Sequence, residues 1–151
     1  RSQQGRATFL LGTAQEIALK TIEKMASRYA ADPDTMIAAI GPGIGACCYQ
    51  VGPEVAKEFA GFNAAWAEAA EPVNLDLTEI NRQQLIKAGL RERNVLTGAP
   101  CTKCDTTYGF HSYRRDGEEA GRMISSIGIM NKHQMRGPMY KALDQTEIRL
   151  D

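Results

Sequence analysis

The stretch PCTKCDTTYGFHSYRRDG, at positions 100–117, holds many of the side chains in this sequence that could do chemistry. Cys101 and Cys104 have the C-x-x-C spacing of half a zinc site or of a redox pair, and His111 follows seven residues later. A structural zinc site needs four ligands, and one C-x-x-C supplies only two. A thioredoxin-type pair should open a helix, whereas this pair lies between two strand-like runs. We therefore expect Cys101 and Cys104 to hold no metal and to form a turn.

Two further cysteines, Cys47 and Cys48, are adjacent in a glycine-rich segment, 42–52. Either could complete a ligand set with the C-x-x-C pair and His111, but only if the fold brings them together. Free cysteines are commonly small buried hydrophobes, and we expect burial for at least one of the two. Four cysteines, two of them adjacent, make a poor disulfide framework for 151 residues, which favours a reduced, cytoplasmic chain.

Arg114 ends the run YGFHSYR (108–114), which we expect to be a strand, and Arg115 follows it. Arg114 and Arg115 offer planar groups of N–H donors that suit a phosphate or carboxylate, so they are candidates for binding substrate. The alternative is salt bridging with Asp116, Glu118 and Glu119.

The segment GPGIG (41–45) follows an expected strand, as a phosphate-binding loop would. A dinucleotide fingerprint needs G-x-G-x-x-G leading directly into a helix. Here the spacing is G-x-G-x-G, Pro42 removes one amide, and the next helix signal comes at Pro53. The pattern instead predicts a tight turn at which backbone segments approach closely.

The elements that position these residues follow from periodicity, capping signals and turn residues. Two capping boxes are expected, Thr13 with Glu16 and Asp76 with Glu79. We predict helices at 13–30, from Pro53 and at 78–89, and strands at 35–41, 72–77, 94–100, 108–114 and 122–130. The strands gather toward the C-terminal end of the chain, which predicts an α+β fold.

Composition limits the partners of the chain. The formal net charge is zero, from 18 basic and 18 acidic residues, which leaves no electrostatic basis for binding nucleic acid or an anionic membrane. No apolar run approaches the roughly 20 residues of a membrane span. The two histidines in the chain cannot build both a blue-copper site and a trinuclear oxygen-reducing cluster, which argues against copper.

Three segments together resemble a known family. IGPGIGACCYQVGPEV (40–55), LDLTEINRQQL (75–85) and CTKCDTTYGFHSYRRDGEEAGRMISSIGI (101–129) are similar in order and spacing to the laccase-domain family. That family is also called multicopper polyphenol oxidase-like, purine nucleoside phosphorylase or peptidoglycan editing factor. The resemblance implies mixed β-sheet layers sandwiched by α-helices. It also implies zinc-assisted phosphorolysis of adenosine- and inosine-type nucleosides, with adenosine deamination alongside; for some members it implies editing of peptidoglycan precursors.

The same resemblance places the family's zinc ligands upstream. They are a His, a Cys and a His, and the last belongs to a motif H-A-G-W-R-G-T-A. Gly12, Thr13 and Ala14 fit the end of that motif, and Ala7 stands where its His should be. The resemblance therefore implies a single domain over 1–130 that lacks its N-terminal half, followed by a C-terminal extension over 131–151.

Two hypotheses follow. The first is the C-terminal part of a purine nucleoside phosphorylase-like enzyme, acting on a purine nucleoside and phosphate. In it Arg114 or Arg115 faces substrate, and this chain binds no metal itself. The alternative is a non-catalytic zinc-binding or interaction module built on Cys101, Cys104 and His111.

Overall fold

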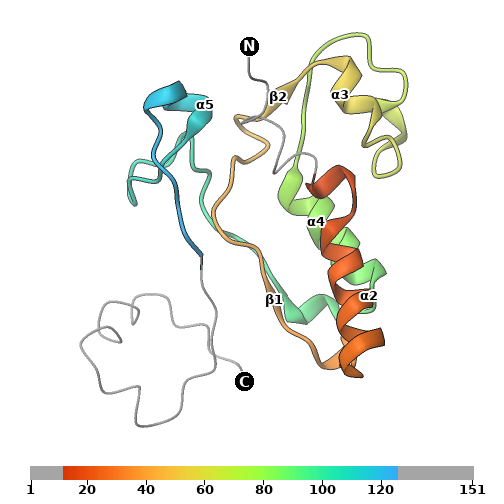
Figure 1. Ribbon diagram of the computed structural model, residues 1–151. Coiled ribbons are helices and arrows are strands. Elements are labelled where there is room, and N and C mark those ends of the chain that lie inside the picture. Colours follow the sequence, from red (N-terminus) through yellow and green to blue (C-terminus); the bar gives the residue numbers. More distant parts are fainter. Residues whose placement is uncertain (1–11, 126–151) are drawn as a thin grey trace, which may run out of the picture.

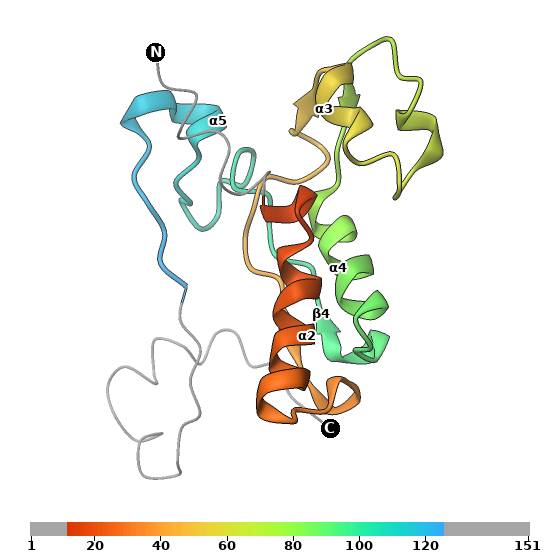
Figure 2. The same ribbon diagram turned by 45° about the vertical axis from the view of Figure 1, so that its right-hand side comes forward.

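The computed structural model describes residues 12–125. Within them, α2 (Ile17–Tyr29) and α4 (Leu77–Lys87) lie side by side, as both views in Figures 1 and 2 show. The strands form a parallel pair, β1 (Ala38–Ala39) with β4 (Val95–Leu96), and an antiparallel pair, β2 (Gln50–Val51) with β3 (Val73–Asn74). The remaining elements are α3 (Pro53–Lys57), α5 (Tyr113–Asp116) and short 3-10 turns at Pro33–Thr35, Ala64–Trp66, Glu92–Asn94 and Gly117–Glu119. The expected α+β class is confirmed.

The start of α2 is fixed by α4 and not by the capping box expected there. Glu16 takes a left-handed conformation, with φ 55°, and no side chain caps the helix. The Thr13 hydroxyl instead accepts a hydrogen bond from Asn81 Nδ2 at 3.1 Å, and the Thr13 carbonyl accepts one from the buried Gln84 Nε2 at 2.7 Å. The polar side chains that hold this helix end therefore come from a helix about 70 residues later in the chain.

The start and end of α4 follow the sequence signals. The Asp76 carboxylate accepts a hydrogen bond from the Glu79 amide at 2.9 Å, as an N-cap residue does. Glu79 does not return the bond, because its carboxylate pairs with Arg82 at 2.7 Å. Gly89 ends the helix with φ +104°, a conformation that glycine adopts without strain.

Apolar packing joins these elements through two clusters that both include residues of α4. One cluster lies between α3, β2, β3 and the first half of α4, and the other between α2, the second half of α4 and β4. Their buried members are Tyr49, Val51, Ala56, Phe59, Leu75, Leu77 and Ile80 in the first, and Ile22, Leu85, Leu90 and Val95 in the second.

The parallel pair continues beyond its strands. Ala38 lies opposite Val95 and Ala39 opposite Leu96, and a further bridge joins Gly43 to Cys101. The two chain segments therefore run together from 38 to 43 and from 95 to 101. The strands expected within 35–41, 72–77 and 94–100 are confirmed, although each is short.

The expected strand over 108–114 is wrong, because none of these residues forms a strand. Tyr113–Asp116 forms α5, because the Ser112 carbonyl accepts hydrogen bonds from the amides of Arg115 and Asp116, at 3.1 and 2.8 Å. Residues 122–125 form no strand either, and the rest of the strand expected over 122–130 lies outside the described residues, as do Ala7 and the extension over 131–151. Among the residues described, none of the helices is long and apolar enough to cross a bilayer.

Candidate functional site

Beyond the parallel pair, the loop after β1 faces the turn after β4. The Thr102 amide donates a hydrogen bond to the Gly43 carbonyl at 2.9 Å, and the Gly45 amide donates one to Cys101 Sγ at 3.2 Å. A Cβ at Gly45 would lie 3.3 Å from the Cβ of Cys101 and 3.4 Å from Cys47 Sγ. The close backbone approach expected of the GPGIG segment is therefore confirmed, and Gly45 is where it occurs.

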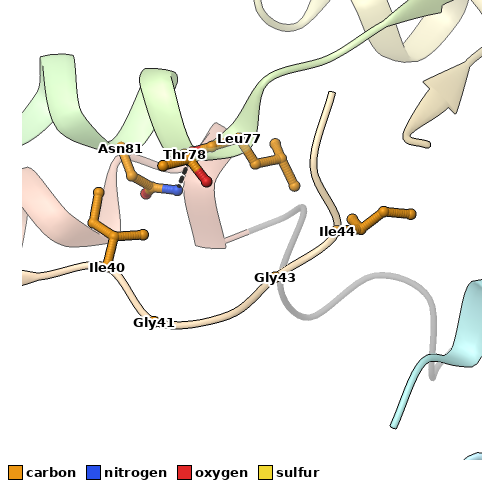
Figure 3. Close-up of a pocket in the computed structure, with 7 residues that line it drawn as sticks. All are labelled: Ile40, Gly41, Gly43, Ile44, Leu77, Thr78 and Asn81. Carbon is orange, nitrogen blue, oxygen red and sulfur yellow. Dashed lines mark hydrogen bonds between the residues drawn. The ribbon is translucent and has the colours of Figure 1, made fainter. Parts of the chain in front are cut away.

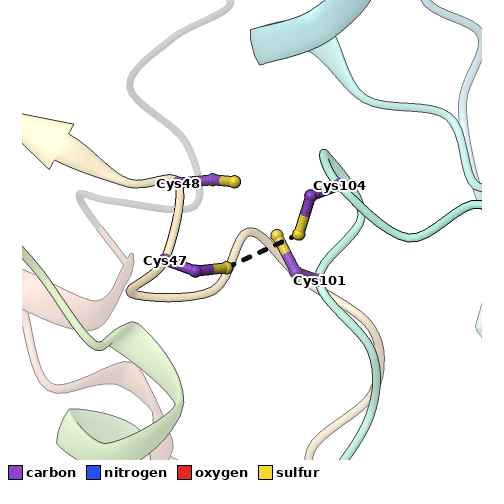
Figure 4. Close-up of side chains that lie close together, drawn as sticks. All are labelled: Cys47, Cys48, Cys101 and Cys104. Atoms are coloured by element: carbon purple, nitrogen blue, oxygen red, sulfur yellow. Dashed lines mark hydrogen bonds between the residues drawn. The ribbon is translucent and has the colours of Figure 1, made fainter.

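The four cysteine thiols of the chain converge at this junction (Figure 4). The sulfur atoms of Cys47, Cys48, Cys101 and Cys104 all lie within 4.8 Å of one another, and those of Cys47 and Cys104 are 3.6 Å apart. None is in a disulfide. Four thiols at this spacing lie close enough to hold a metal ion.

We expected Cys101 and Cys104 to hold no metal because one C-x-x-C supplies only two ligands. The fold supplies Cys47 and Cys48 as a second pair of sulfur atoms, and Cys48 is half-buried, with neither of the two fully buried. His111, the third ligand considered from sequence, is not in the group; its ring lies within 3 Å of the position that a Cβ on Gly121 would occupy.

A sequence signal for this second pair did exist. Both pairs of cysteines follow strands, expected at 35–41 and 94–100, that pair in parallel. The carboxyl ends of parallel neighbours meet at one edge of a sheet, so residues just after them can be brought together. The pairing of these two strands is the step that sequence reasoning missed.

The backbone distinguishes one thiol from the others. Partial burial works against the thiolate of Cys101, but hydrogen bonds from the amides of Gly45 and of its own turn outweigh it and lower the pKa of Cys101 to about 6. A hydrogen bond with Cys104, assisted by the other thiols, raises the pKa of Cys47 to about 12. Cys101 is therefore the thiol that ionises most readily, whereas Cys47 favours its protonated form.

Arg115 is bound within its own segment. Its Nε and Nη2 donate to the Asp116 carboxylate at 2.7 and 2.8 Å. Its Nη1 donates to the carbonyls of Thr102 and Lys103 at 3.1 and 3.4 Å, and Nη2 also donates to the Phe110 carbonyl at 2.7 Å. This side chain holds the C-x-x-C turn against α5, and the salt bridge to Asp116 is one of those considered from sequence.

Arg114, in the same short helix, contacts the other cysteine loop. Its guanidinium carbon is 5.1 Å from the centre of the Tyr49 ring, and Nη1 donates to the Gln50 carbonyl at 3.2 Å. The side chain is exposed and reaches the residues that directly follow Cys47 and Cys48. The arginine pair thus contacts both cysteine loops, one arginine on each.

A small pocket lies between the glycine loop and the start of α4 (Figure 3). The loop forms one wall and the first turn of α4 the other, where Asn81 Nδ2 donates to the Leu77 carbonyl at 2.7 Å. The lining residues are Ile40, Gly41, Gly43, Ile44, Leu77, Thr78 and Asn81.

Comparison with known proteins places this geometry in context. The family model described as multi-copper polyphenol oxidoreductase laccase matches residues 10–130. A purine nucleoside phosphorylase of Deinococcus radiodurans is 36% identical over 128 residues, covering 83% of this chain and 48% of the relative. The adenosine deaminase RL5, from an unknown prokaryote, is 35% identical over 122 residues, covering 77% of this chain and 46% of the relative. The chain thus spans about half the length of these relatives.

Solved structures agree with the fold. YlmD from Geobacillus stearothermophilus superposes with a TM-score of 0.57 at 29% identity, over 64% of this chain and 38% of that one. The hypothetical protein YfiH from Bacillus licheniformis gives a TM-score of 0.57 at 30% identity, over 63% of this chain and 38% of that one.

Proposed function

Because the chain belongs to the multi-copper polyphenol oxidoreductase laccase family, we propose that it forms part of an enzyme that phosphorolyses purine nucleosides. The observation that carries this proposal is its similarity, across most of the chain, to relatives named purine nucleoside phosphorylase. A relative named adenosine deaminase supports adenosine as a substrate and deamination as a second activity. Editing of peptidoglycan precursors remains an alternative prediction that no contact among the described residues favours.

Phosphorolysis sets clear demands on the protein. A phosphate oxygen attacks C1′ of the ribose, the bond from C1′ to the purine nitrogen breaks, and the base leaves with a proton. The products are ribose 1-phosphate and the free base. The protein must hold the phosphate with N–H donors and stabilise charge on the departing base.

Arg114 is our first candidate for the phosphate or ribose contact. Its guanidinium is exposed, and in the part of the chain that the structure describes it makes one hydrogen bond and one ring contact. Arg115 stays the second candidate, but it would have to release carbonyls or Asp116 to bind an anion. We propose that Arg115 positions the segment that carries Arg114.

The zinc that the family resemblance implies does not fit the described residues. A catalytic zinc takes three protein ligands and keeps one position open. The thiol group here offers four sulfur atoms and no histidine, and Ala7, at the place of the family's last His, lies outside the described residues. In the proposed enzyme, a catalytic zinc would be held by ligands outside the described residues. It would polarise groups at the reacting centre. The two histidines of this chain are too few to build a blue-copper site and a trinuclear copper cluster from its own residues.

We expect the enzyme in the cytoplasm, with a purine nucleoside and phosphate as its partners and neither nucleic acid nor membrane among them. All four cysteines are free, as a reducing compartment requires. The zero net charge supports the absence of a polyanionic partner.

A chimaera tests the proposal. The matching portion of the Deinococcus radiodurans relative would be replaced by the family-matched residues 10–130 of this chain. We expect release of hypoxanthine from inosine that depends on inorganic phosphate, with ribose 1-phosphate as the second product. A chimaera that folds and releases no base with phosphate present would contradict the proposal. The 151-residue chain alone, assayed in parallel, shows whether this half acts by itself.

A further inference from the structure

We propose that Cys47, Cys48, Cys101 and Cys104 bind one zinc ion as a closed, structural site that fastens the C-x-x-C turn to the glycine loop. This inference is independent of the proposed enzymatic activity. It assigns the metal a mechanical role and not a catalytic one.

The spacing of the sulfur atoms fits tetrahedral zinc. With Zn–S bonds of about 2.3 Å, the sulfurs of a tetrahedral site lie about 3.8 Å apart. Here the Cys47 and Cys104 sulfurs are 3.6 Å apart, and every pair in the group lies within 4.8 Å. In Figure 4 the side chains from the two loops point toward a common centre. A small contraction therefore converts this arrangement into a four-sulfur shell.

The backbone around Cys101 is arranged for a metal-bound thiolate. The amide of Gly45, from the opposite loop, donates to Cys101 Sγ at 3.2 Å. The amides of Lys103 and Cys104, in the same turn, also donate to that sulfur. Such N–H donors outside the ligand shell orient thiolates and offset the charge that four of them bring to one dication. Because these amides belong to two separate loops, both loops contribute N–H donors to the proposed site.

Other fates of four clustered thiols fit less well. A disulfide needs a sulfur–sulfur bond of about 2.05 Å and uses the thiols in pairs, whereas here one thiol contacts several others. Zinc undergoes no redox change, so it suits a site at which Cys47 and Cys104 are exposed, where an iron–thiolate centre would meet solvent oxidants. Binding displaces the thiol protons to solvent, so no oxidant or reductant is needed.

A structural zinc ion would stabilise the segment after Cys101, because this segment buries few apolar side chains of its own. Among the described residues 101–125, Ala120 is the buried apolar residue, and Thr102 and Ser112 are the buried polar ones. Small units with too little apolar burial commonly rely on a structural metal. The zinc would hold Arg114 and Arg115 at fixed distances from the glycine loop.

Metal content is the first test. The 151-residue chain, purified under reducing conditions without chelator, would be analysed for zinc, iron and copper together with a count of free thiols. We expect one equivalent of zinc, its loss in the Cys101→Ser, Cys104→Ser double variant, and its retention in His111→Ala. The last variant is the matched control, because it removes an exposed side chain of the same segment that lies outside the thiol group. A parent with four free thiols and no zinc, with disulfides, or with iron instead would overturn the proposal.

A second test does not depend on whether the double variant folds. Zinc would be removed from the parent chain by a strong chelator and replaced with Co²⁺, whose visible bands report tetrahedral thiolate ligation. We expect sulfur-to-cobalt charge transfer and tetrahedral d–d bands, both weakened in Cys48→Ser. Chelation should also lower the melting temperature and speed proteolysis after Lys103 and Arg115, and added zinc should reverse both changes. An octahedral cobalt spectrum, bands unchanged in Cys48→Ser, or no response to chelation would each contradict the four-thiolate site.

Discussion

Residues 13–96 bury Phe59, Leu75 and Ile80 almost completely, whereas among the described residues 101–125 Ala120 is the one buried apolar residue. The first region packs side chains from α2, α3, α4 and four strands into two apolar clusters. The second is held by backbone bonds, by Arg115 and by the thiol group. One region is thus stabilised mainly by area removed from water, and the other by a few directional contacts.

The difference predicts how each region responds to damage. A core loses stability in proportion to the volume removed from it. A region held by a few directional contacts loses stability only when an atom that makes one of them is removed. A substitution at the next residue can leave its stability unchanged. Four experiments test this contrast, beginning with the one expected to have the largest effect.

Phe59→Ala should be the most damaging of these changes. The side chain is 0% exposed within the first apolar cluster, so its loss leaves a cavity costing about 3–5 kcal/mol of unfolding free energy. Urea denaturation followed by circular dichroism measures this. Tyr29→Ala is the control, since Tyr29 is 72% exposed and its loss should stay within about 0.5 kcal/mol. Equal effects of the two changes would mean that the first region is not a packed core.

Gly45→Ala should damage the thiol group specifically. The new methyl group would lie 3.3 Å from the Cys101 Cβ and 3.4 Å from Cys47 Sγ, so the two loops must separate. We expect zinc affinity to fall about 10–100-fold, as for other changes just outside a ligand shell. Gly43→Ala, in the same loop, has nothing within 4 Å of the added carbon and should bind zinc as the parent does. Competition with a chromophoric chelator gives both affinities; if they match, the close approach at Gly45 is unimportant.

Substitution of Arg115 should affect mainly stability, and substitution of Arg114 mainly the response to phosphate. Arg115→Ala removes donors from three carbonyls and Asp116, so the melting temperature should fall and the 101–104 amides should exchange hydrogen faster. Arg114→Ala removes one carbonyl bond and a ring contact and should change both much less. In the active chimaera, Arg114→Ala should raise the phosphate concentration needed for half-maximal rate. A larger thermal effect from Arg114→Ala would reverse the roles of the two side chains.

The smallest expected effect is on the pH dependence of stability. Arg115 lowers the pKa of Asp116 in the second region, and Arg82 lowers that of Glu79 in the first. A carboxyl whose pKa is lower in the folded state stabilises the fold above its unfolded pKa, about 4, and this is lost as pH falls through the folded value. Asp116→Asn and Glu79→Gln should therefore each reduce the difference in urea midpoint between about pH 6 and about pH 3. Because both groups are near the surface, the changes should be small and weaker in high salt. A midpoint difference unchanged in Asp116→Asn would argue against that ion pair.

Sequence reasoning succeeded best where apolar burial and helix signals decide the structure. Asp76 and Gly89 predicted the limits of α4, and the apolar run before Gly41 predicted β1. It failed at α5, because the alternation in 108–114 indicated a strand that had no partner to pair with. The Ser112 carbonyl and Gly117, with φ +59°, favour a turn of helix instead. Local alternation cannot show whether a neighbouring strand is available.

The candidate site was predictable in its parts and not in its assembly. Cys101, Cys104, Arg114 and Arg115 were identified from residue type and spacing alone. The second pair of thiols depends on a contact between residues 57 apart. Each pair of cysteines follows an expected strand, but the local signals do not show that these two strands pair with each other. The capping box expected at Thr13 failed for the same reason, since its hydroxyl bonds to Asn81, 68 residues away.

The parallel pairing of β1 with β4 also sets an order of events as the chain folds. Joining Ala38 to Val95 closes a loop of 57 residues, and the entropy lost in doing so must be met before any contact across it forms. The Cys47–Cys104 contact also spans 57 residues and lies just beyond the paired strands, so once they have paired it closes almost no additional loop. Contacts of such long range slow folding relative to the local turns of α2 and α4. The thiols should therefore come together only after the strands have paired, and soon after that step. A zinc ion that binds them then stabilises a contact formed late in folding, so zinc added during refolding should slow unfolding more than it speeds folding.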